Sequence, residues 1–260
     1  MKNFFFSLLA LSLFLLSSCK PDETVEQDLT ADVEVNFVAE YQNEPLVTFK
    51  NLTYPQSDMT FTVKNFQFFI TDLVLLQSGT ADETELAEVE LLDFAVFDTE
   101  EEAVRGTARS YEDIPVGTYS GIRLGLGVNR DLNRGTTGVY TTAEPLGQNF
   151  WDAWDSYIFA KIEGDVDTTG DDMYDAPEDV TYVLHTGFNE TFRTVTVNTP
   201  ITVTADANNV VKVVIDFEKI FLNQDGTVYD VVNIPQAHGT GNRDAMNGLM
   251  TNFSKAFSVE

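Results

Sequence analysis

The sequence contains a single cysteine, Cys19, and only two histidines among its 260 residues. One cysteine cannot form a disulfide within the chain, and it cannot build a zinc or iron–sulfur site that needs several thiolates. Basic residues are also scarce, with 15 lysines and arginines against 42 aspartates and glutamates. Because phosphate groups are bound by clustered cations, we expect no nucleic-acid partner. The net charge of −27 indicates a strongly solvated surface, or carboxylates that bind cations.

Catalytic signatures are absent as well. The sequence has no H-E-x-x-H, no G-x-x-x-x-G-K-[ST] and no G-x-S-x-G, the patterns typical of zinc proteases, P-loop proteins and serine hydrolases. It also offers no nucleophile with a base beside it. We therefore expect a protein that is not an enzyme.

The apolar run at the N-terminus, Phe4 to Leu16, has thirteen residues, fewer than the roughly 20 needed to span a bilayer. It follows a positively charged start and ends in Leu-Ser-Ser-Cys, which resembles the lipobox of bacterial lipoproteins. We expect residues 1–18 to be a signal peptide and Cys19 to be lipidated as a membrane anchor. The alternative is an ordinary secretion signal whose cysteine is incidental.

Residues 19–30 are acidic and contain few large apolar side chains, so they are expected to form a tether from the anchor. An acidic run directly after the lipidated cysteine resembles the surface-export signal of Bacteroidetes lipoproteins. The expected location is the cell envelope, as an outer-membrane lipoprotein that is periplasmic or surface-exposed. The rest of the chain, residues 31–260, is expected to be a single domain.

Hydrophobic residues recur with the period of β-strands. Val33, Val35 and Phe37 alternate with polar residues, as in a half-buried strand. Expected strands cover 33–37, 59–76, 89–97, 118–128, 157–162, 181–184, 192–197, 201–204 and 210–217. A change of phase near Lys64 and Asn65 predicts a bulge or kink. The acidic segment 80–88 is expected to be a loop, and 244–257 to carry a short helix followed by an edge strand. This pattern predicts an all-β fold, an antiparallel β-sandwich with long loops and one or two short helices.

The segment 147–164 holds both tryptophans of the chain, Trp151 and Trp154, and leads into an expected strand. Large aromatic side chains are usually buried, so this segment is either the main packing centre of the domain or a site built upon it.

The two histidines are His185, at the end of an expected strand, and His238, in an expected loop. Two histidines in a chain of this size are more often structural than ligands. A shared copper or zinc site would need a further donor.

A second metal candidate is the acidic segment 165–175. The carboxylates of Asp165, Asp167, Asp171 and Asp172 surround Gly170 in sequence, and calcium binds several such oxygens at close spacing. The alternative is an exposed hairpin loop without an ion.

Several stretches together resemble one family, the MbnP-like proteins. The matching segments, in the order that the family has them, are Phe66-Gln67-Phe68-Phe69-Ile70-Thr71-Asp72-Leu73, Leu91-Leu92-Asp93, Ile114-Pro115-Val116-Gly117-Thr118-Tyr119, Gly127-Val128-Asn129, the aromatic segment Asn149 to Gly164, and Tyr182-Val183-Leu184-His185-Thr186-Gly187. They extend over most of residues 32–260.

The resemblance implies a β-rich periplasmic or surface protein that binds copper through histidines and kynurenine, an oxidised tryptophan. A di-haem cytochrome c peroxidase-like partner produces that kynurenine in characterised members. Trp151 falls on the first tryptophan of the family pattern, His185 on its histidine, and His238 in a C-terminal loop where members often have one. Trp154 stands one place off the pattern, which makes it the better candidate for a core residue.

The chain departs from the family at one ligand position, because it has no histidine near Ala39, where many members carry one. A smaller ligand set is expected to weaken copper binding. Two hypotheses follow. The chain is either a lipid-anchored metal-binding protein, or a surface lipoprotein that keeps the fold without metal and acts as an interaction or ligand-binding module.

Overall fold

A computed structural model describes residues 29–134 and 141–260 of the chain. The strands are β1 (Thr30–Tyr41), β2 (Glu44–Pro45), β3 (Leu52–Thr53), β4 (Thr60–Gln77), β5 (Glu83–Asp93), β6 (Thr107–Pro115), β7 (Gly117–Leu126), β8 (Phe150–Trp151), β9 (Ser156–Asp167), β10 (Val180–Gly187), β11 (Arg193–Val197), β12 (Ile201–Val203), β13 (Asn209–Asp216), β14 (Gln236–Ala237) and β15 (Phe257–Val259). The α-helices are α1 (Glu100–Arg105), α2 (Glu218–Phe221) and α3 (Arg243–Phe253).

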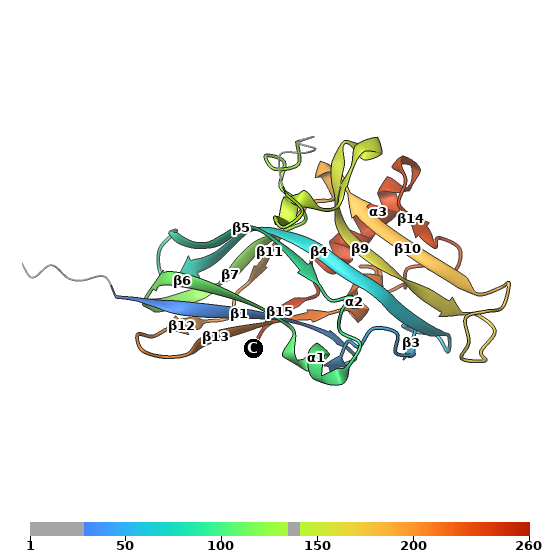
Figure 1. The fold of residues 1–260 in the computed structure, drawn as a ribbon, viewed down its shortest axis with the longest axis horizontal. Helices are drawn as coiled ribbons and strands as arrows, with labels where there is room; N and C mark the ends of the chain where they lie inside the picture. Colours follow the sequence, from blue (N-terminus) through green and yellow to red (C-terminus); the bar gives the residue numbers. More distant parts are fainter. Residues whose placement is uncertain (1–28, 135–140) are drawn as a thin grey trace, which may run out of the picture.

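These described strands form a five-stranded sheet, which contains β1, β6, β13 and β15, and a ten-stranded sheet built around β4. Figure 1 shows the two sheets facing each other over one half of the molecule, where the chain enters through β1. In the other half, α3 packs against β10 of the larger sheet, and α2 packs on α3. The helices therefore cover the larger sheet where the smaller one ends.

The longest strand, β4, has different partners along its length. Phe68 pairs with both β5 and β9, and Ile70 pairs with both β5 and β7. Since a strand has two edges, β9 and β7 must share one edge of β4, with β5 on the other. The register of β4 against β9 shifts between Val63 and Asn65, which confirms the predicted bulge. A second irregularity lies at Asp72, whose φ of 50° is in the left-handed region.

The aromatic core is centred on β4. Phe66 is fully buried, and its ring lies 4.9 Å from that of Phe217 and 5.3 Å from those of Phe68 and Phe94. Phe68 in turn packs 4.9 Å from Phe253 of α3. Rings at these distances and angles pack edge-to-face or offset, which adds to the gain from burial. The main packing centre is therefore this phenylalanine cluster rather than the segment with the tryptophans.

The all-β, sandwich-like fold predicted from the sequence is confirmed, with two differences in pairing. β1 runs parallel to β13, and β14 runs parallel to β10, so the sheets are mixed rather than wholly antiparallel. The predicted helix and edge strand near the C-terminus are confirmed as α3 and β15.

The prediction of a loop at residues 80–88 was wrong, because β5 begins at Glu83. The acidic residues that suggested a loop lie on an edge strand, where charge protects unpaired backbone groups against pairing with another chain. Helix α1 was also missed. Its first turn is held by Thr99, whose side chain accepts a hydrogen bond from the backbone of Glu102 and donates one to its carboxylate, as in a capping box.

The expected signal peptide, Cys19 and nearly all of the expected tether lie outside the described residues. Within the described ranges, no helix is both long and apolar enough to cross a membrane.

We predict that replacing Phe66 with alanine lowers the free energy of unfolding by about 3–5 kcal/mol, because it removes a fully buried ring from the centre of the cluster. Chemical denaturation would measure this change. Val96→Ala is the control, since Val96 is 63% exposed and its truncation should change stability by no more than about 0.5 kcal/mol. Equal effects of the two substitutions would contradict the proposed core.

Candidate metal site

Three polar side chains lie together on the outer face of β9 and β10. In the antiparallel register, His185 stands opposite Lys161, and Glu163 lies two residues further along β9 on the same face. The intervening Ile162 points inward and is buried. The arrangement brings Nε2 of His185 to 2.5 Å from Oε1 of Glu163. The strand pairing thus creates a histidine–carboxylate contact on the surface of the sheet.

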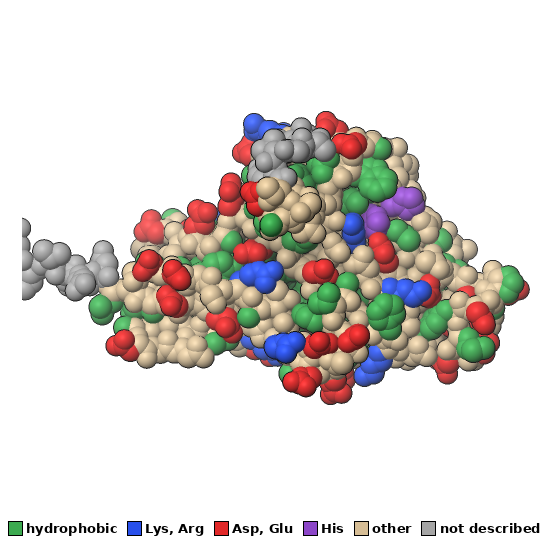
Figure 2. All heavy atoms as spheres, in the orientation of Figure 1, with side chains coloured by type: hydrophobic (Ala, Val, Ile, Leu, Met, Phe, Trp, Pro, Cys, Tyr) green, Lys and Arg blue, Asp and Glu red, His purple; other side chains and the backbone are tan. Residues whose placement is uncertain are grey.

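His238 reaches the same place through a different pairing. The short strand β14 runs parallel to β10, with Gln236 beside Val183 and Ala237 beside Leu184. The next residue of β10 is His185, and the residue directly after β14 is His238, so the register sets the two histidines side by side. Their ring centroids are 6.2 Å apart, and Figure 2 shows the two histidines adjacent on the surface, in purple. His238 is exposed, while His185 is largely buried.

Burial controls the charge of His185. It lowers the pKa of His185 below the ordinary value of histidine, against the opposing effect of the hydrogen bond and negative charge of Glu163. Lys161 and the neighbouring ring of His238 lower that pKa further. His185 is therefore neutral at physiological pH, with one ring nitrogen free to accept a proton or a metal ion.

The two imidazoles fit a shared metal ion in chemistry and in spacing. Imidazole is a ligand suited to copper and zinc, and zinc–nitrogen bonds of about 2.0–2.1 Å place two bound nitrogens no more than about 4 Å apart. A centroid separation of 6.2 Å is compatible with one nitrogen of each ring binding one ion. Among residues 29–134 and 141–260, however, no group of three or more His, Cys, Asp or Glu side chains is placed to hold a metal. The site therefore offers two protein donors.

The tryptophans lie next to this face. Gly187 follows His185 by two residues on β10, and a Cβ at Gly187 would come within 3.0 Å of the indole of Trp154. Trp154 is half-buried, and its ring lies 5.0 Å from that of Phe188 in a tilted arrangement. The prediction that Trp154 is a core residue was therefore wrong, because its ring lies at the surface. Trp151 is 48% exposed, and its ring lies 6.2 Å from that of Trp154. Both indoles are therefore near the strand that carries His185.

Comparison with known proteins places the chain in a family. The family model of MbnP matches residues 30–239, a range that includes both histidines. The chain belongs to the MbnP family. Among solved structures, MbnP from Methylosinus trichosporium has the same fold, with a TM-score of 0.55 and 14% sequence identity over 89% of this chain and 98% of that one. No curated protein matches the chain in sequence.

Glu163 and Lys161 belong to this candidate site, although the sequence did not single them out as site residues. Residues 157–162 were predicted as a strand only, without a face for Lys161. The sequence did not show which strands flank β9, so the proximity of Glu163 to a histidine depended on the register.

The structure separates the four aspartates of the calcium hypothesis. Asp165 and Asp167 belong to β9 and are buried, whereas Asp171 and Asp172 are exposed in the following loop. Asp165 forms an ion pair with Lys64 and accepts a hydrogen bond from the hydroxyl of Thr181.

Asp167 organises the loop after β9. One of its oxygens accepts hydrogen bonds from the backbone of Thr169 and Gly170, at 2.8 and 2.7 Å, and from the hydroxyl of Thr169. The other oxygen accepts one from the backbone of Asp172, at 2.7 Å. Burial alone would raise the pKa of Asp167, but these hydrogen bonds outweigh it and lower the pKa. Asp167 thus has a structural role in this loop, and calcium binding stays a prediction.

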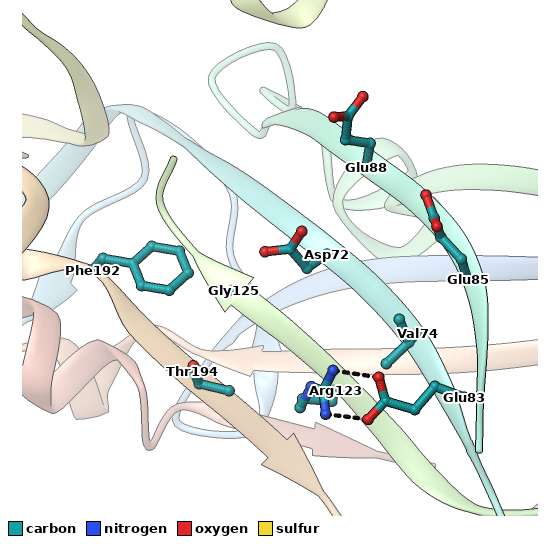
Figure 3. A pocket seen from close by; sticks show the side chains of 9 residues that line it. All are labelled: Asp72, Val74, Glu83, Glu85, Glu88, Arg123, Gly125, Phe192 and Thr194. Atoms are coloured by element: carbon teal, nitrogen blue, oxygen red, sulfur yellow. Dashed lines mark hydrogen bonds and ion pairs between the residues drawn. The ribbon is translucent and has the colours of Figure 1, made fainter. Parts of the chain in front are cut away.

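A cavity of about 620 Å³ lies on the outer face of β4, β5, β7 and β11. Figure 3 shows Asp72 and Phe192 facing each other across Gly125, with Arg123 paired to Glu83 further along. The side chain of Asn129 donates to both oxygens of Asp72, at 3.1 and 3.0 Å. Neither histidine lines this cavity, so it is distinct from the metal candidate.

We predict that Asp167→Asn lowers stability at neutral pH, because the amide cannot accept all four hydrogen bonds that the carboxylate accepts. In the wild type, the stability from a lowered pKa is fully present above the unfolded pKa of about 3.9 and is lost as the pH falls through the folded pKa. Denaturation midpoints measured between neutral and acidic pH would show a smaller acid loss in the variant. Asp175→Asn, at an exposed position of the same loop, should retain the wild-type profile. Identical profiles for Asp167→Asn and the wild type would contradict this role.

Proposed function

We propose that this MbnP-family protein binds one copper ion at His185 and His238 and acts in metal binding or metal handling, without catalytic turnover of its own. The observation that carries the proposal is the parallel register of β14 on β10, which sets two residues distant in sequence beside each other. The family resemblance of the sequence, which implies copper binding through histidines, supports copper over the other metals that imidazole accepts.

The burial of His185 supports the same proposal. A neutral imidazole needs no proton release before it binds a metal ion, so its lowered pKa favours binding at neutral pH. The exposure of His238 leaves the site open to solvent and to a docking partner. With two protein donors, water or a group from a partner would complete the coordination.

The proposed function includes oxidation of one of the two tryptophans. Trp151 falls on the first tryptophan of the family pattern, and its exposure leaves it accessible to a di-haem peroxidase-like partner. Trp154 is the second candidate, because its ring packs over Gly187 on the strand that carries His185. Oxidation of either one would give a kynurenine near the strand that carries His185.

The alternative function is an interaction or ligand-binding module that retains the fold without metal. It is favoured by the absence, in the described parts of the chain, of a third donor placed with the two histidines. The two hypotheses differ in one measurable property, the affinity for copper at the histidines.

Copper binding can be tested with untagged protein by Cu(I) competition against a chromophoric chelator. We expect one ion per chain, and His185→Ala or His238→Ala should weaken binding at least tenfold, about 1.4 kcal/mol. Gln236→Ala, at an exposed position of β14, is the matched control and should bind as the wild type does. Protein purified from its own host should contain copper, and mass spectrometry of the peptide with Trp151 and Trp154 should show an oxidised tryptophan. Binding that survives loss of both histidines, with unmodified tryptophans, would favour the metal-free module.

We propose further that Cys19 carries a lipid that anchors the protein to the outer membrane. The first strand begins at Thr30, at one end of the long axis, and the histidines lie nearer the other end. An anchor before β1 would therefore display the histidine face away from the membrane.

Replacing Cys19 with alanine is expected to move the protein from the membrane fraction to the soluble fraction of its host, because it removes the only thiol available for lipidation. Immunoblots of separated fractions would measure the change. Ser18→Ala keeps a small residue before the cysteine and is the control. A Cys19→Ala variant that stays in the membrane fraction would contradict lipid anchoring.

A further inference from the structure

Glu163 is the carboxylate that contacts a histidine ring within the described residues. The distance from its Oε1 to Nε2 of His185 is 2.5 Å, and both side chains are substantially shielded from solvent. An ionised carboxylate can only accept hydrogen bonds. The hydrogen bond between Oε1 of Glu163 and Nε2 of His185 therefore needs the hydrogen on Nε2, which leaves Nδ1 as the nitrogen that can offer a lone pair to a metal ion.

We propose that Glu163 is a positioning residue for the metal site, which fixes His185 as the Nε2–H tautomer so that Nδ1 is the nitrogen that binds the ion. This inference rests on the proposed function and names the ligand atom, the tautomer and the residue that sets them. Metal-binding histidines commonly donate their second ring N–H to a carboxylate, which orients the ring and makes the other nitrogen more basic.

The backbone holds Glu163 firmly in place. β9 is flanked on both sides, and Glu163 is paired with Asn65 of β4 on one edge and Val183 of β10 on the other. A carboxylate on a strand flanked on both edges loses little conformational freedom when it binds a neighbour, so it can hold the imidazole in one orientation.

A chain of polar groups keeps the nearest cation engaged. Nζ of Lys161 lies 2.5 Å from Oδ1 of Asn149, whose amide donates to Gln67 at 2.7 Å. Gln67 then donates to Asn65 at 3.2 Å. The ammonium group has its own partner in this row, so the oxygen of Glu163 remains directed at His185.

The alternative role for Glu163 is direct metal binding as a third donor. The placement of the side chains disfavours this role, because Glu163, His185 and His238 do not form a three-donor group in the described structure. The Glu163 oxygen nearest to His185 is also already occupied by the Nε2 contact.

The tautomer can be tested by long-range ¹H–¹⁵N NMR of protein with ¹⁵N-labelled histidine, first without metal. The wild type should show His185 with the hydrogen on Nε2. Glu163→Ala should show a mixture of tautomers, because nothing then holds the N–H. Glu163→Gln should keep the Nε2–H form, since the amide carbonyl can accept the same bond. Glu178→Ala, at an exposed position before β10, is the matched control and should match the wild type.

Addition of Cu(I), which is diamagnetic, tests the ligand atom in the same spectra. The Nδ1 resonance of His185 should shift on binding, and Glu163→Ala should weaken the affinity by about 10- to 100-fold. The loss should be smaller in Glu163→Gln. If Glu163→Ala does not fold, as judged from the dispersion of its amide spectrum, the wild-type and Glu163→Gln spectra still decide between the two nitrogens.

The outcomes separate this inference from the proposed function. Wild-type protein that binds Cu(I) through both histidines, but through Nε2 of His185 or with unchanged affinity in Glu163→Ala, would overturn the role of Glu163 alone. An Nδ1–H tautomer in the metal-free wild type would do the same. Wild-type protein that binds no Cu(I) would overturn both proposals.

Discussion

The structure depends on β4, which pairs with two different strands, β9 and β7, along the same edge. β4 pairs with β9 over residues 60–68 and with β7 over residues 70–77, while β5 occupies its other edge. The irregularities at Lys64 and Asp72 adjust the strand's register to these partners. The same strand supplies Phe66 and Phe68 to the core, so sheet pairing and core packing are fixed by one segment.

The candidate metal site is built upon this framework. β4 pairs with β9, β9 pairs with β10, and β10 pairs with β14. The positions of both histidines therefore depend on the backbone hydrogen bonds between these strands. The inner face of β10 is anchored too, where the hydroxyl of Thr186 contacts the sulfur of Met250 in α3 at 3.1 Å. His185 points to the opposite face, as the alternation of a strand requires. A rigid support on one side thus allows an open, polar site on the other.

Several of the carboxylates that give the protein its large negative charge have structural roles. Asp167 caps the loop after β9, Glu83 pairs with Arg123, and the acidic residues of β5 line an edge strand. Each use places carboxylates where backbone donors, a cation or water can reach them. The number of carboxylates therefore does not indicate metal binding in this protein. The contact between Glu163 and His185 bears on metal binding because it involves a ring nitrogen of a candidate ligand.

Much of the fold could be predicted from periodicity, because alternation along a strand reflects which side faces the core. Val33, Val35 and Phe37 are all buried, and the phase change at Lys64 is a bulge. The acidic strand β5 could not be predicted in this way, since its polar residues face solvent at an edge and resemble a loop. The two parallel pairings were also missed, because pairing direction is set by contacts between distant segments.

The sequence by itself determined the fold class, the family resemblance and the two histidines as the candidate ligands, all of which are local properties of residue order. Only the tertiary structure decided that these histidines meet, that Glu163 holds one of them, and that the tryptophans lie at the surface. The physical reason is register: a shift of β14 along β10 by one residue would turn its side chains to the other face and separate the rings. That register depends on backbone pairing across the whole sheet and is not encoded in any one segment.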